Sequence, residues 1–377
     1  MSTSTVRRAL FGWGHSHFLP LNRSATNLLQ PVLLNHEPDY ALPATEAITC
    51  MAAGWGHSLL STKENVYGFG LNHGNQLGQV NKDHIVMMLK DHTQVKHLGC
   101  GREHSHIVLH QQGRDHLYSM GNNMYGQLGL SESKASRPGT FVTQSKPTQV
   151  TIQESSITNL VCGLDNTIFS TDTATFGMGW GADGQLGQGD EKAMDQATPH
   201  RVALEGRVKK LSSSTDFTLA LMDDGALWVW GNSEYGQGMQ GRKIDRILSP
   251  TPVTTMGRVV DIAAGGPFSI VLTDDGKVYS CGYGSLGRGS DTLESLALGQ
   301  VNGLDNRKIT GVFAATDYAA ALSDSGDLFT WGLNGSSGRL GLGHVDHAFT
   351  AVRLEFHGWQ VESLVLGTNH AMALCVE

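Results

Sequence analysis

The sequence lacks several features that would narrow its function at once. It contains no run of about 18 consecutive apolar residues, so no membrane-spanning helix is expected. Basic residues are a minority, with 27 Lys and Arg against 35 Asp and Glu, which gives a net charge of −8. A protein that wraps nucleic acid non-specifically usually carries a basic face, so whole-molecule basicity of that kind is excluded and only a local patch is left open.

Cysteine is scarce, and no catalytic arrangement is recognisable. The five cysteines form no CxxC pair and are odd in number, which favours a reducing interior over a disulfide framework. No set of nucleophile, base and orienting residue can be assembled from the sequence. We therefore predict a protein that is not an enzyme and that has no catalytic residue, no metal site and no cofactor.

Glycine, in contrast, is abundant and periodic. There are 47 glycines, and seven of them end similar apolar segments, as in Phe11-Gly-Trp-Gly14 and Phe329-Thr-Trp-Gly332. These anchoring glycines are assigned to positions 14, 70, 121, 181, 231, 282 and 332, with spacings of 56, 51, 60, 50, 51 and 50 residues. Periods of this size indicate a solenoid, a propeller or another repeat array.

Each repeat also contains a small residue followed three positions later by a second recurring residue. The pairs are Gly54/His57, Gly101/His104, Gly163/Asn166, Ser214/Phe217, Gly265/Phe268, Ala315/Tyr318 and Gly367/His370. Because Asn, Phe or Tyr replaces His at the second position in other repeats, the side chain there is expected to pack or to form hydrogen bonds. His57, His104 and His370 belong to different repeats, so they are not expected to converge on one metal ion.

The repeat predicts an all-β, seven-bladed propeller that occupies residues 1–377 as one domain. Turns such as Asp224-Gly225 and Asp275-Gly276 lie between apolar runs and indicate hairpins. Four short antiparallel strands in about 50 residues describe a propeller blade. The chain starts with one half-repeat and ends with the complementary half. Residues 1–15 are therefore expected to supply a closing strand that pairs with the C-terminal strands and removes the free sheet edges.

These elements resemble the regulator-of-chromosome-condensation (RCC) repeat propeller family over essentially the whole chain. The shared motifs are Gly-x-x-His-Ser/Thr, Asp-Gly, Trp-Gly and Gly-Gln-Leu-Gly. Longer strings, such as Cys100-Gly-Arg-Glu-His104-Ser and Gly179-Trp-Gly-Ala-Asp-Gly-Gln185, resemble the mitochondrial RCC-like branch of the Williams–Beuren region. WD and kelch propellers fit less well, because no Trp-Asp terminator or regular Gly-Gly doublet occurs.

The resemblance implies two functions that do not require bond chemistry. The first is an interaction scaffold in mitochondria, in the matrix or associated with the inner membrane. It would support large-subunit ribosomal RNA and mitoribosome assembly together with a pseudouridine synthase module. The second is a guanine nucleotide exchange factor for a mitochondrial dynamin-like fusion GTPase. The expected partners are therefore mitoribosome assembly proteins and large-subunit rRNA, or a GTPase.

The loop inside the recurring residue pair supplies the candidate partner-binding residues. Glu103, Asp165, Asp216 and Asp317 occupy the same loop position, so they are expected to lie on one face of the ring. In the nuclear exchange factor of the family, acids in two such loops beside a lengthened blade contact the GTPase. Here the resemblance implies that Asp165 matches the second acid, whereas Arg102 stands where the first would be, with Glu103 beside it. That departure weakens the case for the same exchange chemistry.

The lengthened repeat adds a second candidate. Its extra residues are assigned to an extended blade loop at 130–150, which carries Lys134, Arg137 and Lys146 and the single acid Glu132. Surface lysines and arginines are usually only solvated, but this loop also offers contacts to RNA phosphates.

Two further patterns are interpreted as structural. Gly179–Gly184 and Gly282–Gly287 spell GxGxxG, but a dinucleotide site needs that string between a strand and a helix, and here strand follows. The repeated tryptophans and tyrosines are expected to pack between blades. Trp55 and Trp359 break the pattern and are expected at the surface.

The N-terminus has the composition of a targeting segment. Residues 1–8 carry hydroxyls and two arginines, and no acid precedes Glu37, as in transit peptides. The first strand is expected by about Ala9, which leaves little to remove, so a short polar tail is an equal alternative.

Overall fold

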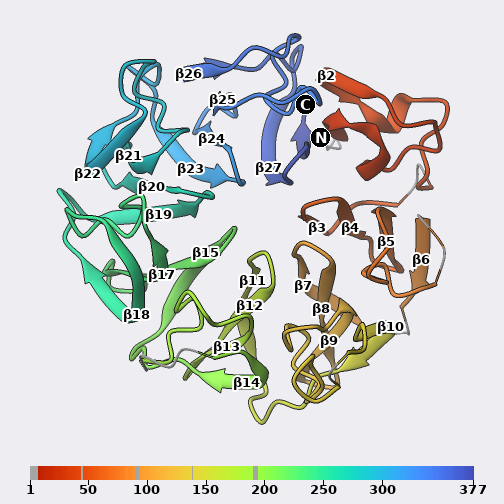
Figure 1. The fold of residues 1–377 in the computed structure, drawn as a ribbon. Helices are drawn as coiled ribbons and strands as arrows, with labels where there is room; N and C mark the ends of the chain where they lie inside the picture. The colour runs from red at the N-terminus through yellow and green to blue at the C-terminus, as the bar shows by residue number, and fades with distance from the viewer. Residues whose placement is uncertain are drawn as a thin grey trace.

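Seven four-stranded antiparallel sheets are arranged around a central axis, as Figure 1 shows. The computed structural model describes residues 7–43, 46–80, 82, 84–89, 93–137, 139–189 and 194–377. This confirms the predicted seven-bladed, all-β propeller. Only two short 3-10 helices, η1 (Ser16–Phe18) and η2 (Leu34–His36), occur among the described residues. Their shortness fits a sequence in which the apolar residues alternate with a strand period.

We number the blades from the first complete one. Blade 1 is β3 (Cys50–Ala53), β4 (His57–Ser61), β5 (Asn65–Gly70) and β6 (His84–Met88). Blade 2 is β7 (Gln94–Cys100), β8 (His104–Gln111), β9 (Arg114–Asn122) and β10 (Thr143–Gln149). Blade 3 is β11 (Ile157–Cys162), β12 (Asn166–Thr171), β13 (Thr175–Gly179) and β14 (Gln196–Arg201). Blade 4 is β15 (Val208–Ser213), β16 (Phe217–Met222), β17 (Leu227–Ser233) and β18 (Ile244–Val253).

The remaining blades follow the same order from the axis outward. Blade 5 is β19 (Val259–Ala264), β20 (Phe268–Thr273), β21 (Val278–Tyr283) and β22 (Glu294–Gln300). Blade 6 is β23 (Ile309–Ala314), β24 (Tyr318–Ser323), β25 (Leu328–Gly332) and β26 (Ala348–Arg353). Blade 7 combines both ends of the chain: β27 (Gln360–Leu366), β28 (His370–Val376), β1 (Arg8–His15) and β2 (Asn27–Leu33).

The ring closes as predicted, with β1 lying between β28 and β2. The register runs from Arg8 opposite Val376 to Gly14 opposite His370. Arg7 adds an exposed ion pair with Glu377 at 2.6 Å. Residues 1–6 of the predicted closing segment lie outside the described residues. The closing strand is therefore β1, at 8–15.

Two predicted boundaries were wrong. The fourth of the seven anchoring glycines is Gly179 and not Gly181, because Gly179 lies opposite Asn166 with a φ of 102°, like the other anchors. The sequence has a Gly at both positions, and only the strand pairing distinguishes them. The extra residues of blade 2 connect β9 to β10 over 123–142, whereas residues 143–149 of the predicted loop form β10 itself. Pro138 of that loop lies outside the described residues.

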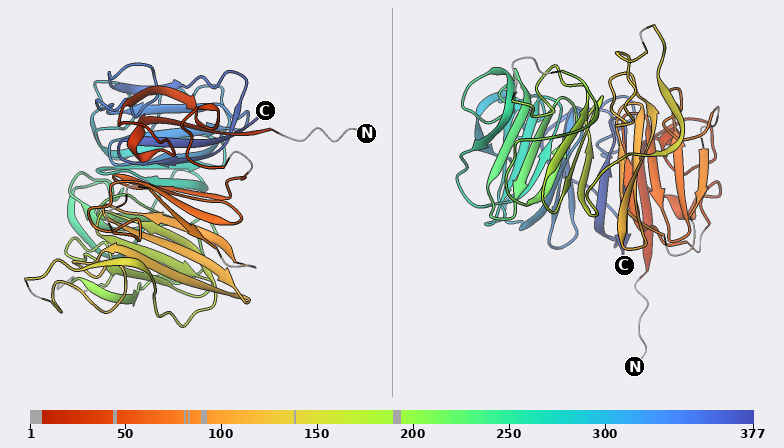
Figure 2. Two further views of the ribbon diagram at one scale, coloured as in Figure 1. Left: turned by 90° about the vertical axis from the view of Figure 1, so that its right-hand side faces the viewer. Right: turned by 90° about the horizontal axis from the view of Figure 1, so that it is seen from below.

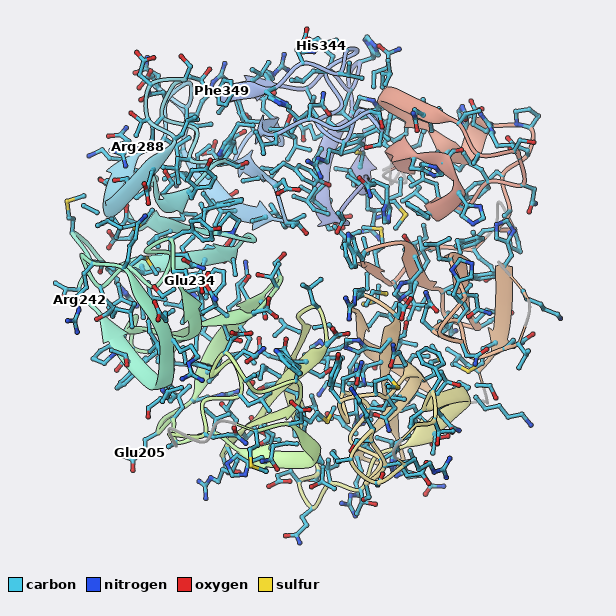
Figure 3. All side chains as sticks on the ribbon, in the orientation of Figure 1. Glu205, Glu234, Arg242, Arg288, His344 and Phe349 are labelled. Carbon is cyan, nitrogen blue, oxygen red and sulfur yellow. The ribbon has the colours of Figure 1, made fainter. Side chains whose placement is uncertain are left out.

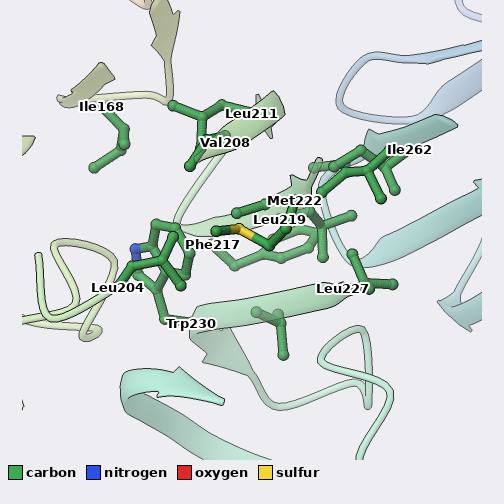
Figure 4. Close-up of a cluster of buried hydrophobic side chains, with 14 of the residues drawn as sticks. Ile168, Leu204, Val208, Leu211, Phe217, Leu219, Met222, Leu227, Trp230 and Ile262 are labelled. Carbon is green, nitrogen blue, oxygen red and sulfur yellow. The ribbon is translucent and has the colours of Figure 1, made fainter. Parts of the chain in front are cut away.

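The core lies between neighbouring blades. Figure 4 shows one cluster in which Trp230 and Phe217 pack with apolar side chains of the adjoining blades. Three fully buried tryptophans donate their indole N–H groups to backbone carbonyls of the preceding blade: Trp13 to Arg339 at 2.9 Å, Trp230 to Gln185 at 2.8 Å and Trp331 to Ser285 at 3.1 Å. A buried indole needs such a partner. The predicted packing role is confirmed for these tryptophans.

The recurring pair of small residue and third-following residue has a steric origin. In blade 2, a Cβ on Gly101 would lie 2.1 Å from Cε1 of His104, and in blade 5 a Cβ on Gly265 would lie 2.3 Å from the ring of Phe268. The side chain therefore covers the glycine three positions before it. This is why the offset is constant along the chain.

The histidines of these pairs also link neighbouring blades. His57 Nε2 lies 2.8 Å from Ser105 Oγ, and His370 Nε2 lies 2.6 Å from Ser58 Oγ. Burial lowers the pKa of His57 to about 4 and that of His370 to about 3, so both rings are neutral at pH 7. The expected packing and hydrogen-bonding role of this position is confirmed.

Candidate partner-binding face

Two sets of loops share one face of the propeller. We call inner loops those between the first and second strands of each blade, at 54–56, 101–103, 163–165, 214–216, 265–267, 315–317 and 367–369. Outer loops join the third and fourth strands, at 71–83, 123–142, 180–195, 234–243, 284–293, 333–347 and 16–26. In an antiparallel blade these connections all emerge on the same side. We call this side the loop face.

The inner loops are hydrogen-bonded to one another in a closed ring. Seven contacts of 2.8–3.3 Å link consecutive blades: Trp55 N to Gly101 O, Arg102 N to Leu164 O, Leu164 N to Thr215 O, Thr215 Oγ1 to Gly266 O, Gly266 N to Thr316 O, Thr316 Oγ1 to Thr368 Oγ1, and Thr368 N to Gly54 O. The inner loops are thereby held in place before any partner arrives, which reduces the ordering cost of binding.

Exposed apolar side chains gather on this face. Of the eleven large apolar residues that are exposed among the described residues, nine lie in the loop-face loops or at a strand end beside them. They are Trp55, Leu71, Val80, Phe141, Met194, Tyr235, Tyr283, Leu293 and Val345. Only Met256 and Val352 lie elsewhere. This asymmetry makes the loop face the candidate interaction surface of the ring.

A groove of about 600 Å³ opens on the loop face between blades 7, 1 and 2. Its apolar walls are Phe18, Trp55, Leu71, Tyr125 and Phe141. Trp55 is 40% exposed and Phe141 is 59% exposed, so the prediction that Trp55 lies at the surface is confirmed. We call this the Trp55 groove. Its volume lies in the range of small-molecule and peptide sites, roughly 300–1,000 Å³.

The lengthened connection of blade 2 forms one side of the groove. Figure 2 (right) shows this segment, in yellow, rising from one face while the C-terminus lies at the other. Phe141 and Met124, near its two ends, line the groove. Figure 3 shows side chains of other outer loops, with Arg242, Arg288 and His344 at the periphery of the ring.

Beside the groove, three of the four predicted loop acids come together. Glu103, Asp165 and Asp216 come from the consecutive blades 2, 3 and 4. Two acids of an outer loop also lie close, since Asp195 raises the pKa of Asp165 and Asp183 raises that of Asp216. We call these five residues the acidic cluster. Asp317 is separated from them by blade 5, whose inner loop has no acid, and it pairs with Arg339 at 3.2 Å.

Arg102 is the cation of this region. Its guanidinium forms an ion pair with the buried Asp165 and lies 5.7 Å from the centre of the Trp55 ring. The guanidinium is thus shared between a carboxylate and an aromatic face, a common arrangement for Arg. Arg102 therefore neutralises the acid that the family resemblance assigns to a partner.

Burial, and after it the neighbouring acids, raises the pKa values of two carboxyl groups in this cluster. Burial raises the pKa of Asp165, and Glu103 and Asp195 raise it further, against the opposing effect of Arg102. Burial, with Asp183 and Asp165, raises the pKa of Asp216 to about 6. Clusters in which like charges and burial perturb carboxylates are enriched at functional sites.

We expect Asp216→Asn to stabilise the protein at pH 7.5 and to have almost no effect at pH 4. A carboxyl group whose pKa is higher in the folded protein than in the unfolded chain, where it is about 3.9, lowers the free energy of unfolding as pH rises from about 4 to about 6. Above about pH 6 the whole of this loss remains. For a pKa of about 6 the cost at pH 7.5 is at most about 2–3 kcal/mol.

Urea unfolding of the wild type and the variant at both pH values measures this difference. The exposed Asp305→Asn serves as the control and should change neither midpoint. An equal increase in the free energy of unfolding at both pH values would contradict a charge effect and would indicate a packing effect.

The predicted basic residues do not gather into one patch. Burial raises the pKa of Asp195, and Lys134 lies close enough to oppose that rise. Arg137 pairs with Glu132 at 2.5 Å within the same segment. Lys146 lies on β10 and lines a separate apolar depression between blades 1 and 2. None of the three lines the Trp55 groove.

Sequence reasoning missed one cluster of potential metal ligands. Ligand atoms of His104, His106 and Cys162 lie within 4.8 Å of one another. The Nε2 atoms of the two histidines lie 3.1 and 2.8 Å from Thr167 Oγ1, so a hydroxyl already fills the space between them. The strand alternation of His104 and His106 was the available signal, because residues two apart point to the same side.

The other candidate sites have structural explanations. Gly179–Gly184 lies at the end of β13, and the described residues that follow, 180–189, contain no helix that could face a pyrophosphate. No helix among the described residues is long and apolar enough to span a membrane.

The comparisons with known proteins agree with this architecture. Residues 114–169, 174–221 and 224–272 match the Regulator of chromosome condensation (RCC1) repeat, and a second description of that repeat matches 208–237 and 259–288. The chain is 30% identical over 369 residues to the "RCC1-like G exchanging factor-like protein" of Mus musculus, covering 89% of this chain and 78% of the relative.

Two solved structures have the same fold. Human WBSCR16 superposes with a TM-score of 0.82 and 26% identity, over 98% of this chain and 99% of the other. Prp20p from Saccharomyces cerevisiae, studied for its binding to Gsp1p and histones, has a TM-score of 0.80 at 22% identity, over 100% and 93% of the two chains. The repeats, the closed ring and these matches show that the chain belongs to the family of RCC1-repeat propellers.

Proposed function

We propose that this protein is a non-catalytic regulator of a GTPase and that it acts as an exchange factor through its loop face. The observation that carries the proposal is that the loop face holds most of the exposed apolar residues among the described ones, together with an acidic cluster beside the lengthened blade. The similarity to a protein named as RCC1-like and G exchanging factor-like supports the class of partner.

Exchange needs differential affinity and no nucleophile. A protein that binds the nucleotide-free state of a GTPase more tightly than the GDP-bound state shifts the equilibrium toward release. The hydrogen-bonded inner loops offer a rigid surface for such a contact, and the connection between β9 and β10 projects beside them. We propose mitochondria as the location and a dynamin-like fusion GTPase as the substrate, as the family resemblance implies.

We expect the wild-type protein to accelerate release of a fluorescent GDP analogue from that GTPase, and Asp165→Ala to reduce the acceleration about tenfold. Loss of the Asp165 carboxylate frees Arg102, whose position over Trp55 then changes. A change of about 1.4 kcal/mol in partner affinity gives this factor. Stopped-flow measurement of release gives the rate.

Asp305→Ala, an exposed acid in a connection on the opposite side of the ring, is the matched control and should release GDP like the wild type. No acceleration by the wild-type protein would overturn the proposal.

A second function is the scaffold in mitoribosome assembly. Lys134 and Arg137 favour it, because both lie in the connection between β9 and β10 on the loop face, where they offer contacts to RNA phosphates. Ultraviolet cross-linking in mitochondria tests it. Large-subunit rRNA recovered with the wild type, and lost with Lys134→Ala/Arg137→Ala, is the expected result for the scaffold. Absence of both rRNA and assembly proteins would exclude it.

A further inference from the structure

The Trp55 groove contains one carboxylate, that of Glu103, and no described Lys or Arg forms an ion pair with it. Glu103 is the only acid among the residues that line the groove. Its one side-chain partner is Asn122, whose Nδ2 donates to it at 2.9 Å. An ionised carboxylate has about four acceptor positions, so most of the hydrogen-bonding capacity of Glu103 is free.

The structure holds this carboxylate in a defined place. The Asn122 side chain also accepts the backbone N–H of Met124 at 2.9 Å, and the backbone N–H of Asn122 donates to Glu103 O at 2.8 Å. Asn122 is itself buried. The Glu103 side chain is therefore held by a buried amide and its backbone by a second hydrogen bond, which favours one orientation for an incoming donor.

The surroundings attract cations. Arg102 is occupied by Asp165, while Asp183, Asp195 and Asp216 lie on the same side. Five acids against Arg102 and Lys134 still leave an excess of negative charge beside a low-dielectric apolar groove, which strengthens the local field. The same field opposes phosphates and acidic segments.

We propose that the Trp55 groove receives a polypeptide segment of the partner in which a Lys or Arg stands next to a large apolar side chain. The apolar side chain packs against Trp55, Leu71 and Phe141, and the cation donates to Glu103. This inference rests on the proposed function, because it describes the segment that a regulated partner presents to the loop face. A nucleic acid is disfavoured there by the acidic cluster.

The inference is tested with a displayed library of random peptides and the full chain. Selected peptides are expected to carry Lys or Arg within two residues of an aromatic or aliphatic residue. Their binding is then measured by fluorescence anisotropy against four variants. Glu103→Gln should weaken binding roughly five-fold, as for a half-exposed ion pair. Phe141→Ser removes an exposed apolar wall and should weaken it by a similar factor, because roughly 1 kcal/mol of apolar contact is lost.

Two matched controls accompany these variants. Val352→Ser removes an exposed apolar side chain far from the groove, and Asp305→Asn removes an exposed acid on the opposite side. Neither should alter binding. Added salt should weaken binding to the wild type more than to Glu103→Gln, because exposed charges are screened.

Several outcomes would overturn the inference. The selected peptides could lack a basic residue, or they could bind Glu103→Gln as well as the wild type. The library could also yield nothing that depends on the groove. Each of these results would contradict the inference. The GTPase assay is independent of these results. Groove-dependent basic peptides without accelerated GDP release would leave the inference standing and reject the proposed function.

Discussion

Deletion of residues 1–15 is expected to abolish the cooperative unfolding of the whole ring. The deletion removes β1, which supplies the third strand of blade 7 and pairs with both β2 and β28. Leu10, Phe11 and Trp13 are at most 5% exposed, and loss of one such aromatic already costs about 3–5 kcal/mol. Free energies of unfolding are typically about 5–15 kcal/mol, so the loss of all three side chains exceeds what the folded ring can tolerate.

Circular dichroism during heating and limited proteolysis measure this effect. Arg8→Ala is the control within the same strand. Its ion pair with Glu362 at 2.9 Å is exposed, so a change below about 1 kcal/mol is expected. Adding a synthetic peptide of residues 7–18 should restore the transition in the deleted protein if the missing strand is the cause. Unchanged thermal stability in the deletion would refute ring closure by β1.

Gly101→Ala is expected to destabilise blade 2 by several kcal/mol. The new Cβ would lie 2.1 Å from Cε1 and 2.6 Å from Nδ1 of His104. His104 is fully buried, so its ring has nowhere to move. Overpacking of this kind costs typically about 1–3 kcal/mol and more where the neighbours are rigid. The same position carries a carbonyl of the inner-loop ring, so the loop face should loosen as well.

Gly257→Ala provides the matched control. Its Cβ would meet only Thr273 at 3.5 Å, and its backbone is not in the left-handed region, so a neutral or slightly stabilising change is expected. Urea denaturation compares the two variants. A Gly101→Ala/His104→Ala double variant should lose less stability than the two single changes added together, because Ala at 104 removes the clash. Additive losses would show that the contact is not the cause.

The recurring residues were predictable because each has the same local environment in every blade. The offset between Gly101 and His104 reflects one steric contact inside a single loop, so it recurs wherever that loop recurs. The anchoring glycines likewise share one strand-end conformation with φ near 100°. One anchoring glycine was predicted wrongly, as Gly181 in place of Gly179. The two glycines lie two residues apart, and only the pairing of Gly179 with Asn166 distinguishes them.

The site residues were predictable only in part. The common loop position of Glu103, Asp165 and Asp216 predicted a shared face, but their charge states depend on neighbours from other loops. Arg102 meets Asp165 across 63 positions of sequence and thereby leaves Glu103 as the unpaired acid of the groove. Cys162 meets His104 and His106 of the neighbouring blade for the same reason, since contacts between blades have no fixed spacing along the chain.

The sequence by itself determined the blade number, the strand order and the closure of the ring. Each follows from the period of about 50 residues and from the complementary half-repeats at the two ends of the chain. The strands of each sheet come from one repeat or from those two halves, so their pairing can be predicted from the sequence pattern. Only the tertiary structure decided which face collects the exposed apolar residues and which acid lacks a cation. Those properties arise where loops of different blades meet, and their distances and burial exist only once the ring has closed.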